Sequence, residues 1–110
     1  MISIAAIITA ICAESGITEP DLISPRRAAA TVRARHVAMY LARHLTGASY
    51  PQIAAAFGDR DHTSVIYAVR RIAMDLPGDA ALAGRIDTVR AELAGRAGAQ
   101  SSSARASQCA

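Results

Sequence analysis

The sequence contains no tryptophan and no lysine, and aromatic residues make up only 4% of its 110 residues. Aromatic side chains favour strands, whereas alanine, which is abundant here, is the strongest helix former. This balance favours an all-α fold, and a chain of this length is expected to form one domain with a modest core. The lack of lysine excludes a P-loop, which needs a lysine to hold nucleotide phosphates, so ATP binding is not expected.

Cysteine is also scarce: the sequence contains two, Cys12 and Cys109. Neither has a second cysteine or a histidine at the spacing of metal ligands, so we expect neither a metal site nor a disulfide framework. No Ser/His/Asp or Cys/His arrangement can be placed, so we expect no enzyme and no cofactor. The cysteine usage fits a reducing cytoplasm.

Long apolar runs are also missing. No segment approaches the roughly 20 apolar residues that a membrane span needs, so no membrane association is expected. Residues 2–13 are apolar, but they lack the basic segment that opens an export signal. Ile4, Ile7, Ile8 and Ile11 recur at the spacing of one helix face, which predicts a core helix.

The net charge of +3 is unevenly distributed, and all twelve basic residues are arginines. Residues 24–74 carry eight arginines against two aspartates, a net charge of +6, whereas residues 1–23 carry three acidic residues and no base. A concentrated basic block is what a polyanionic partner requires, and guanidinium groups match phosphates and guanine edges. On charge alone, a solvated basic face without a partner explains the block equally well.

Apolar periodicity and helix-breaking residues predict about six helices, over residues 3–14, 17–23, 31–45, 50–57, 61–74 and 79–94. We expect one helical domain over residues 1–94 and a disordered tail over residues 95–110, which are rich in serine, alanine and glycine. In the third helix the predicted buried face consists of Val37, Tyr40, Leu41 and Leu45. The opposite face consists of Arg35, His36, Met39 and Arg43.

The helix over residues 50–57, the glycine-containing turn and the amphipathic helix over residues 61–74 form a helix-turn-helix pattern. In such motifs the second helix enters the major groove of DNA and presents its first residues to base edges. Here those residues are Asp61, His62, Thr63 and Ser64, short polar groups that can donate or accept hydrogen bonds. Asp61 is also a good N-cap, so the pattern alone is equally typical of an ordinary capped helix.

Three segments carry a family resemblance: Arg26-Arg27, residues 32–43 with the sequence VRARHVAMYLAR, and residues 56–65 with the sequence AFGDRDHTSV. Together they closely resemble the C-terminal DNA-binding domain of the bacterial chromosomal replication initiator DnaA, over residues 2–76. The resemblance implies sequence-specific binding of double-stranded DNA at a DnaA-box-like site. It also implies a role in replication initiation or its regulation, at the bacterial nucleoid.

The resemblance implies roles for individual residues as well. Arg27 matches an arginine that enters the minor groove, and Asp61, His62 and Thr63 match residues that contact bases in the major groove. Ser64 keeps the hydroxyl of a residue that contacts backbone or bases. The arginines of the third helix match phosphate contacts, and Pro51 lies close to DNA. The complete set of predicted DNA-binding residues is Arg27, Arg33, Arg35, Arg43, Pro51, Arg60, Asp61, His62, Thr63, Ser64 and Arg70.

The chain departs from the family pattern at several positions. Residues 28–30 are alanines where family members often carry basic or serine residues, which is expected to weaken the minor-groove arm. His36 replaces a residue that is commonly glutamine. Asp59 replaces the second of two glycines and places an acid close to where phosphate is expected. A changed affinity or site preference follows from these departures.

The ATPase module of a full initiator has no counterpart here, so DNA recognition without ATP-driven assembly is expected. The chain is either a domain excised from a longer protein or a stand-alone protein. The position of Met1 directly before the first predicted helix, and the tail past the usual domain end, favour a stand-alone protein. The alternative to a protein that binds a DnaA-box-like site is a protein-interaction or transcription-regulatory module that kept the fold without DnaA-box specificity. The sequence leaves any protein partner open.

Overall fold

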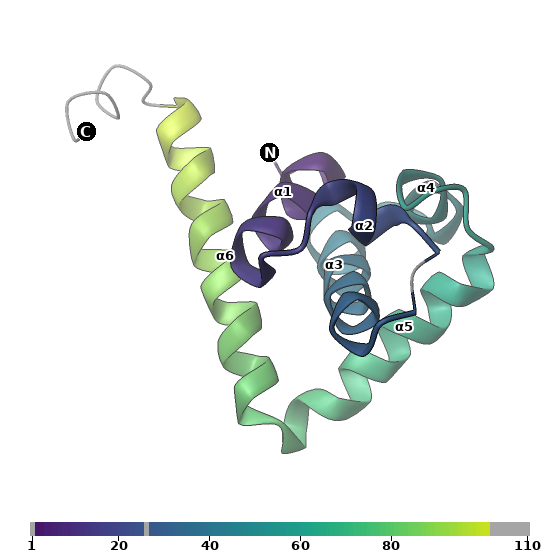
Figure 1. The fold of residues 1–110 in the computed structure, drawn as a ribbon. Coiled ribbons are helices and arrows are strands. Elements are labelled where there is room, and N and C mark those ends of the chain that lie inside the picture. The colour runs from purple at the N-terminus through teal and green to yellow at the C-terminus, as the bar shows by residue number, and fades with distance from the viewer. Residues whose placement is uncertain (1, 26, 102–110) are drawn as a thin grey trace.

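The computed structural model describes residues 2–25 and 27–101, with side chains through residue 95. This part of the chain contains helices and no strand (Figure 1), which confirms the predicted all-α fold of about six helices. The helices are α1 (Ile4–Ser15), α2 (Glu19–Ile23), α3 (Ala29–Thr46), α4 (Tyr50–Ala56), α5 (His62–Asp75) and α6 (Ala80–Ser101), with a short 3-10 helix, η1 (Leu76–Gly78), between the last two.

Local sequence signals explain where most helices begin. The hydroxyls of Ser3, Thr18 and Ser49 each accept a hydrogen bond from a backbone N–H in the first turn of the helix that follows. Ser49 also forms a capping box with Gln52, whose side chain accepts from the Ser49 N–H at 2.8 Å. The carboxylate of Asp61 caps α5. These caps satisfy backbone donors that have no partner within their own helix.

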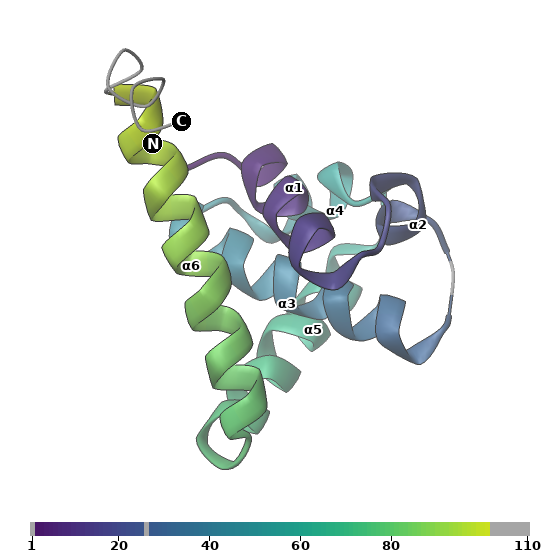
Figure 2. The same cartoon turned by 60° about the vertical axis from the view of Figure 1, so that its left-hand side comes forward.

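The core forms around α3, which packs against α1, α2, α4 and α5. Figures 1 and 2 show α3 running through the middle of the molecule and α6 along one side. Phe57 is the largest of the fully buried side chains and follows directly after α4. The buried face of α5 contributes Val65, Val69 and Ile72 to the core, and the opposite face of the helix is exposed to solvent.

Two predictions about α3 are wrong. Arg35 and Met39 were assigned to the face opposite the buried one, yet their exposed fractions are only 5% and 1%. The periodic pattern predicts one buried face, but α3 is surrounded by helices on several sides and is buried nearly all round. The helix also begins at Ala29, two residues before the predicted start.

The last helix extends further than predicted. A helix ending at residue 94 was expected, with a disordered tail after it, but α6 continues to Ser101. The buried side chains of α6 are Leu82, Ile86, Val89 and Leu93, and the helix packs against α1. Arg85 adds an ion pair to Glu14 of α1 at 2.7 Å. Residues 102–110, and Cys109 with them, lie outside the described residues.

The described residues contain neither a membrane-spanning helix nor a cluster of metal ligands. None of their helices is long and apolar enough to cross a membrane. They also hold no group of three or more histidine, cysteine, aspartate or glutamate side chains that could bind a metal ion.

Candidate nucleic-acid interface

A tight turn joins α4 to α5 and fixes the direction in which α5 begins. Gly58 and Asp59 both adopt positive φ angles, of 87° and 56°. The backbone N–H of Arg60 then donates to the carbonyl of Ala54 at 3.0 Å, which closes the turn onto α4. Gly58 suits this conformation because it has no Cβ. Asp59 tolerates it better than most residues, since aspartate is enriched in the left-handed region.

The first turn of α5 presents four polar side chains to solvent: Asp61, His62, Thr63 and Ser64 are all exposed. Asp61 is the N-cap, and its Oδ1 accepts the backbone N–H of Thr63 at 2.9 Å. This hydrogen bond holds the pKa of the Asp61 carboxyl below its usual value, so the group is ionised at neutral pH. The predicted N-cap role of Asp61 is therefore confirmed. The side chains of His62, Thr63 and Ser64 remain exposed to solvent.

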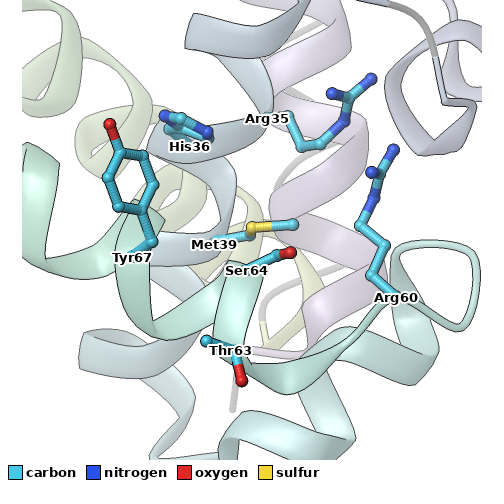
Figure 3. Close-up of a pocket in the computed structure, with 7 residues that line it drawn as sticks. All are labelled: Arg35, His36, Met39, Arg60, Thr63, Ser64 and Tyr67. Carbon is cyan, nitrogen blue, oxygen red and sulfur yellow. The ribbon is translucent and has the colours of Figure 1, made fainter.

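A hollow of about 330 Å³ lies between α3 and α5, beside this first turn (Figure 3). His36 and Tyr67 stand on one side of it with their rings edge to face, 5.9 Å apart, and Arg35 and Arg60 stand on the other. Met39, Thr63 and Ser64 complete the lining. Two arginines in the lining give this hollow a positive field, which suits an anion such as a phosphate.

His36 and Tyr67 were not predicted to belong to the site. Tyr67 follows Thr63 by one helical turn, so the exposed face of α5 offered a signal for it. His36 is on α3, and its approach to α5 depends on how the two helices cross, which the sequence does not reveal. Burial first, and then the nearby arginines Arg35, Arg33, Arg60 and Arg71, lower the pKa of His36 below its usual value of 6.5.

A second hollow, of about 520 Å³, lies on the α4 side of the same turn. Its lining brings Pro51 of α4 together with Arg60, Asp61 and His62, all of which are predicted site residues. Asp59 lines this hollow as well, so the acidic departure from the family pattern lies beside the predicted base-reading residues. Arg60 lines both hollows and therefore marks the boundary between them.

The remaining predicted arginines occupy different environments. Arg27 is exposed in the loop before α3, and Arg70 is exposed on α5. Arg43 is half-buried: its guanidinium stacks over the Tyr50 ring at 4.4 Å and donates to the Ala48 carbonyl at 2.9 Å. It thereby holds the connection between α3 and α4. Arg26, which belongs to the family motif, lies outside the described residues.

Arg33 and Arg35 are engaged within the protein. The Nη1 of Arg33 lies 3.0 Å from the Asp75 carboxylate, and its Nη2 lies 3.6 Å from that of Asp79. The Nε of Arg35 donates to the carbonyl of Leu22 at 2.7 Å from a buried position. The proposed interface therefore does not include the phosphate contacts predicted for Arg33 and Arg35.

A short helix, a tight turn and an amphipathic helix with an exposed polar first turn define a DNA-binding domain of the helix-turn-helix class. The family model "Bacterial dnaA protein helix-turn-helix" matches residues 4–72. The chain belongs to this family.

The similar proteins are longer than this chain. It is 47% identical over 77 residues to a chromosomal replication initiator protein DnaA of Rhodopseudomonas palustris, a match that covers 70% of the chain and 16% of that protein. For the DnaA of Sphingopyxis alaskensis the identity is 44% over 92 residues, covering 84% of the chain and 20% of that protein. A crystal structure of a DNA replication initiation factor superposes with a TM-score of 0.73 at 28% identity, covering 82% of the chain and 27% of the solved one.

Proposed function

We propose that this domain binds double-stranded DNA sequence-specifically at a DnaA-box-like site and acts in replication initiation or its regulation, in the bacterial cytoplasm at the nucleoid. The observation that carries the proposal is the exposed polar first turn of α5, flanked by two hollows that other predicted site residues line. The buried face of the same helix is apolar, so the fold holds this turn rigidly while leaving its side chains accessible.

The side chains of this turn have the chemistry for reading a major groove. Asp61 can accept a hydrogen bond from a cytosine amino group, and His62 can donate or accept at a base edge. Thr63 adds a hydroxyl and a methyl group that fits against a thymine methyl. Arg27, exposed in the loop before α3, supplies the minor-groove contact that the family pattern implies.

Contacts to the DNA backbone orient the domain but carry no sequence information themselves. Ser64 and Tyr67 line the first hollow, where a phosphate would also meet the positive end of the α5 dipole. Arg43 and Arg70 extend the basic surface along α3 and α5. In this arrangement base readout comes from the first turn of α5 and from Arg27, and the surrounding groups set position and affinity.

The substitution His62→Ala tests the assignment of the reading residues. It should weaken binding to a DnaA-box duplex by about 1–3 kcal/mol and leave binding to a scrambled duplex nearly unchanged, because it removes a base contact. Fluorescence anisotropy with both duplexes at about 150 mM salt measures the two affinities. Arg90→Ala, on the exposed face of α6, is the control and should preserve the ratio. A His62→Ala variant with an unchanged ratio would show that α5 does not read the bases.

A further inference from the structure

Two arginines from different elements hold the C-terminal end of α2. Arg35 of α3 donates its Nε to the carbonyl of Leu22 at 2.7 Å and its Nη2 to that of Ser24 at 2.8 Å. Arg60, from the turn before α5, donates its Nη2 to the same Ser24 carbonyl and lies 3.5 Å from the carbonyl of Ile23. The last carbonyls of a helix have no partner within it, so these guanidinium groups satisfy acceptors that would otherwise be unpaired.

Gly58 brings the turn itself against the same end of α2. A Cβ atom at this position would lie 2.6 Å from the carbonyl oxygen of Ile23, closer than side-chain carbons approach an oxygen. The backbone of the turn therefore packs directly on the carbonyl of Ile23. We call this arrangement the α2 clamp: Arg35, Gly58 and Arg60 around the carbonyls of residues 22–24.

The clamp joins the two parts of the chain that are proposed to read DNA. Ser24 stands three residues before Arg27, and Arg60 stands directly before Asp61. We propose that Arg35, Gly58 and Arg60 are positioning residues that fix the separation between Arg27 and the first turn of α5. The inference rests on the proposed function, since it concerns how the minor-groove and major-groove contacts are made to fit one DNA site.

Stability alone is a poor explanation for the clamp. Buried guanidinium groups lose hydration, and apolar packing of similar volume is often at least as stabilising. Arg35 and Arg60 carry like charges that converge on one carbonyl, and the Nε of Arg60 is buried without a hydrogen-bond partner among the described residues. The planar fork of arginine nevertheless spans adjacent carbonyls at a fixed distance, which suits a device that sets geometry.

A double-mutant cycle between Arg27→Ala and Arg60→Lys tests the inference in the full chain. Lysine keeps the charge but is a point donor that cannot reproduce the fork. In the parent, Arg27→Ala should weaken binding to a DnaA-box duplex about tenfold. In the Arg60→Lys background the same change should weaken it by less than about threefold, because a loosened arm already makes a poorer contact.

Arg70→Lys is the matched control, because it is the same substitution on an exposed arginine of α5 outside the clamp. Its effect should add to that of Arg27→Ala. A thermal melt by circular dichroism checks that each variant is folded. If Arg60→Lys is unfolded, Arg35→Lys replaces it in the cycle, because Arg35 donates to the same Ser24 carbonyl from α3.

The outcomes separate the clamp from the proposed function. If Arg27→Ala weakened binding to the DnaA-box duplex about tenfold in both the parent and the Arg60→Lys variant, the positioning role of the clamp would be overturned. The proposed function would stand. An Arg27→Ala variant that binds like the parent would overturn both the reading role of Arg27 and the clamp.

Discussion

Asp59 combines an unfavourable backbone conformation with an unfavourable charge. Its φ of 56° is in the left-handed region, and its side chain lines the hollow shared by Pro51 and His62. The substitution Asp59→Gly should therefore tighten DNA binding, because it removes an anion from a surface that we propose faces phosphates. The gain should be about three- to tenfold at low salt and shrink as salt rises. Asp59→Asn separates charge from conformation, and an affinity that is unchanged in both variants would contradict the placement of DNA beside this hollow.

His36 is expected to make the stability of the free protein depend on pH. Its pKa in the folded state lies below the usual 6.5, first because of burial and then because of the surrounding arginines. Above the usual pKa both states are neutral, and as the pH falls through it the unfolded chain takes up a proton that the folded protein resists. The free energy of unfolding should therefore fall from about pH 7.5 to about pH 5.5.

Urea unfolding of the parent and of His36→Gln at these two pH values measures the effect. Glutamine cannot titrate, so the variant should lose less stability than the parent as the pH falls. Equal losses in the two proteins would show that His36 titrates alike in both states.

At the scale of elements, α6 stabilises the domain by covering α1. Leu93 is fully buried near the end of the described side chains, so Leu93→Ala should lower the free energy of unfolding by about 2–5 kcal/mol. Arg90→Ala, on the exposed face, should change it by less than about 0.5 kcal/mol. Urea unfolding measures both, and similar effects from the two would mean that α6 does not pack on α1 in solution.

Helix ends and buried faces were predictable wherever the signal is local. The capping box of Ser49 and Gln52 and the cap at Asp61 could be read from neighbouring residues, and they set where α4 and α5 begin. The burial of Arg35 could not be predicted, because it depends on two carbonyls at the end of α2, those of Leu22 and Ser24, and on the packing of other helices around α3. The part of the site made by His36 was missed for the same reason: it is created by the crossing of two helices.

At the scale of the whole molecule, the net charge overstates the basic surface. Arg33 and Arg71 both pair with Asp75 at the end of α5, and Arg85 pairs with Glu14. The field available to DNA is therefore centred on the arginines outside these pairs that belong to the proposed interface. These are Arg27, Arg43 and Arg70, since the guanidinium of Arg60 is engaged by the carbonyls at the end of α2.

This distribution predicts the salt dependence of binding. If the three arginines of the proposed interface each neutralise one phosphate, a plot of log affinity against log salt should have a slope of about −3. Arg43→Ala should weaken binding to every sequence and make the slope shallower by about 1, since one phosphate contact is lost. Arg90→Ala removes the same charge far from the proposed interface and should leave the slope unchanged. An Arg43→Ala slope equal to that of the parent would remove Arg43 from the interface.

The central claim is that this domain reads DNA sequence through the first turn of α5. Its most direct test is the ratio of affinities of the parent protein for a DnaA-box duplex and a scrambled duplex of equal length at about 150 mM salt, where non-specific binding is weak. A ratio of about a hundredfold or more in favour of the box is predicted. Equal affinity for the two duplexes would contradict the claim and would indicate a domain that kept the fold without specific reading.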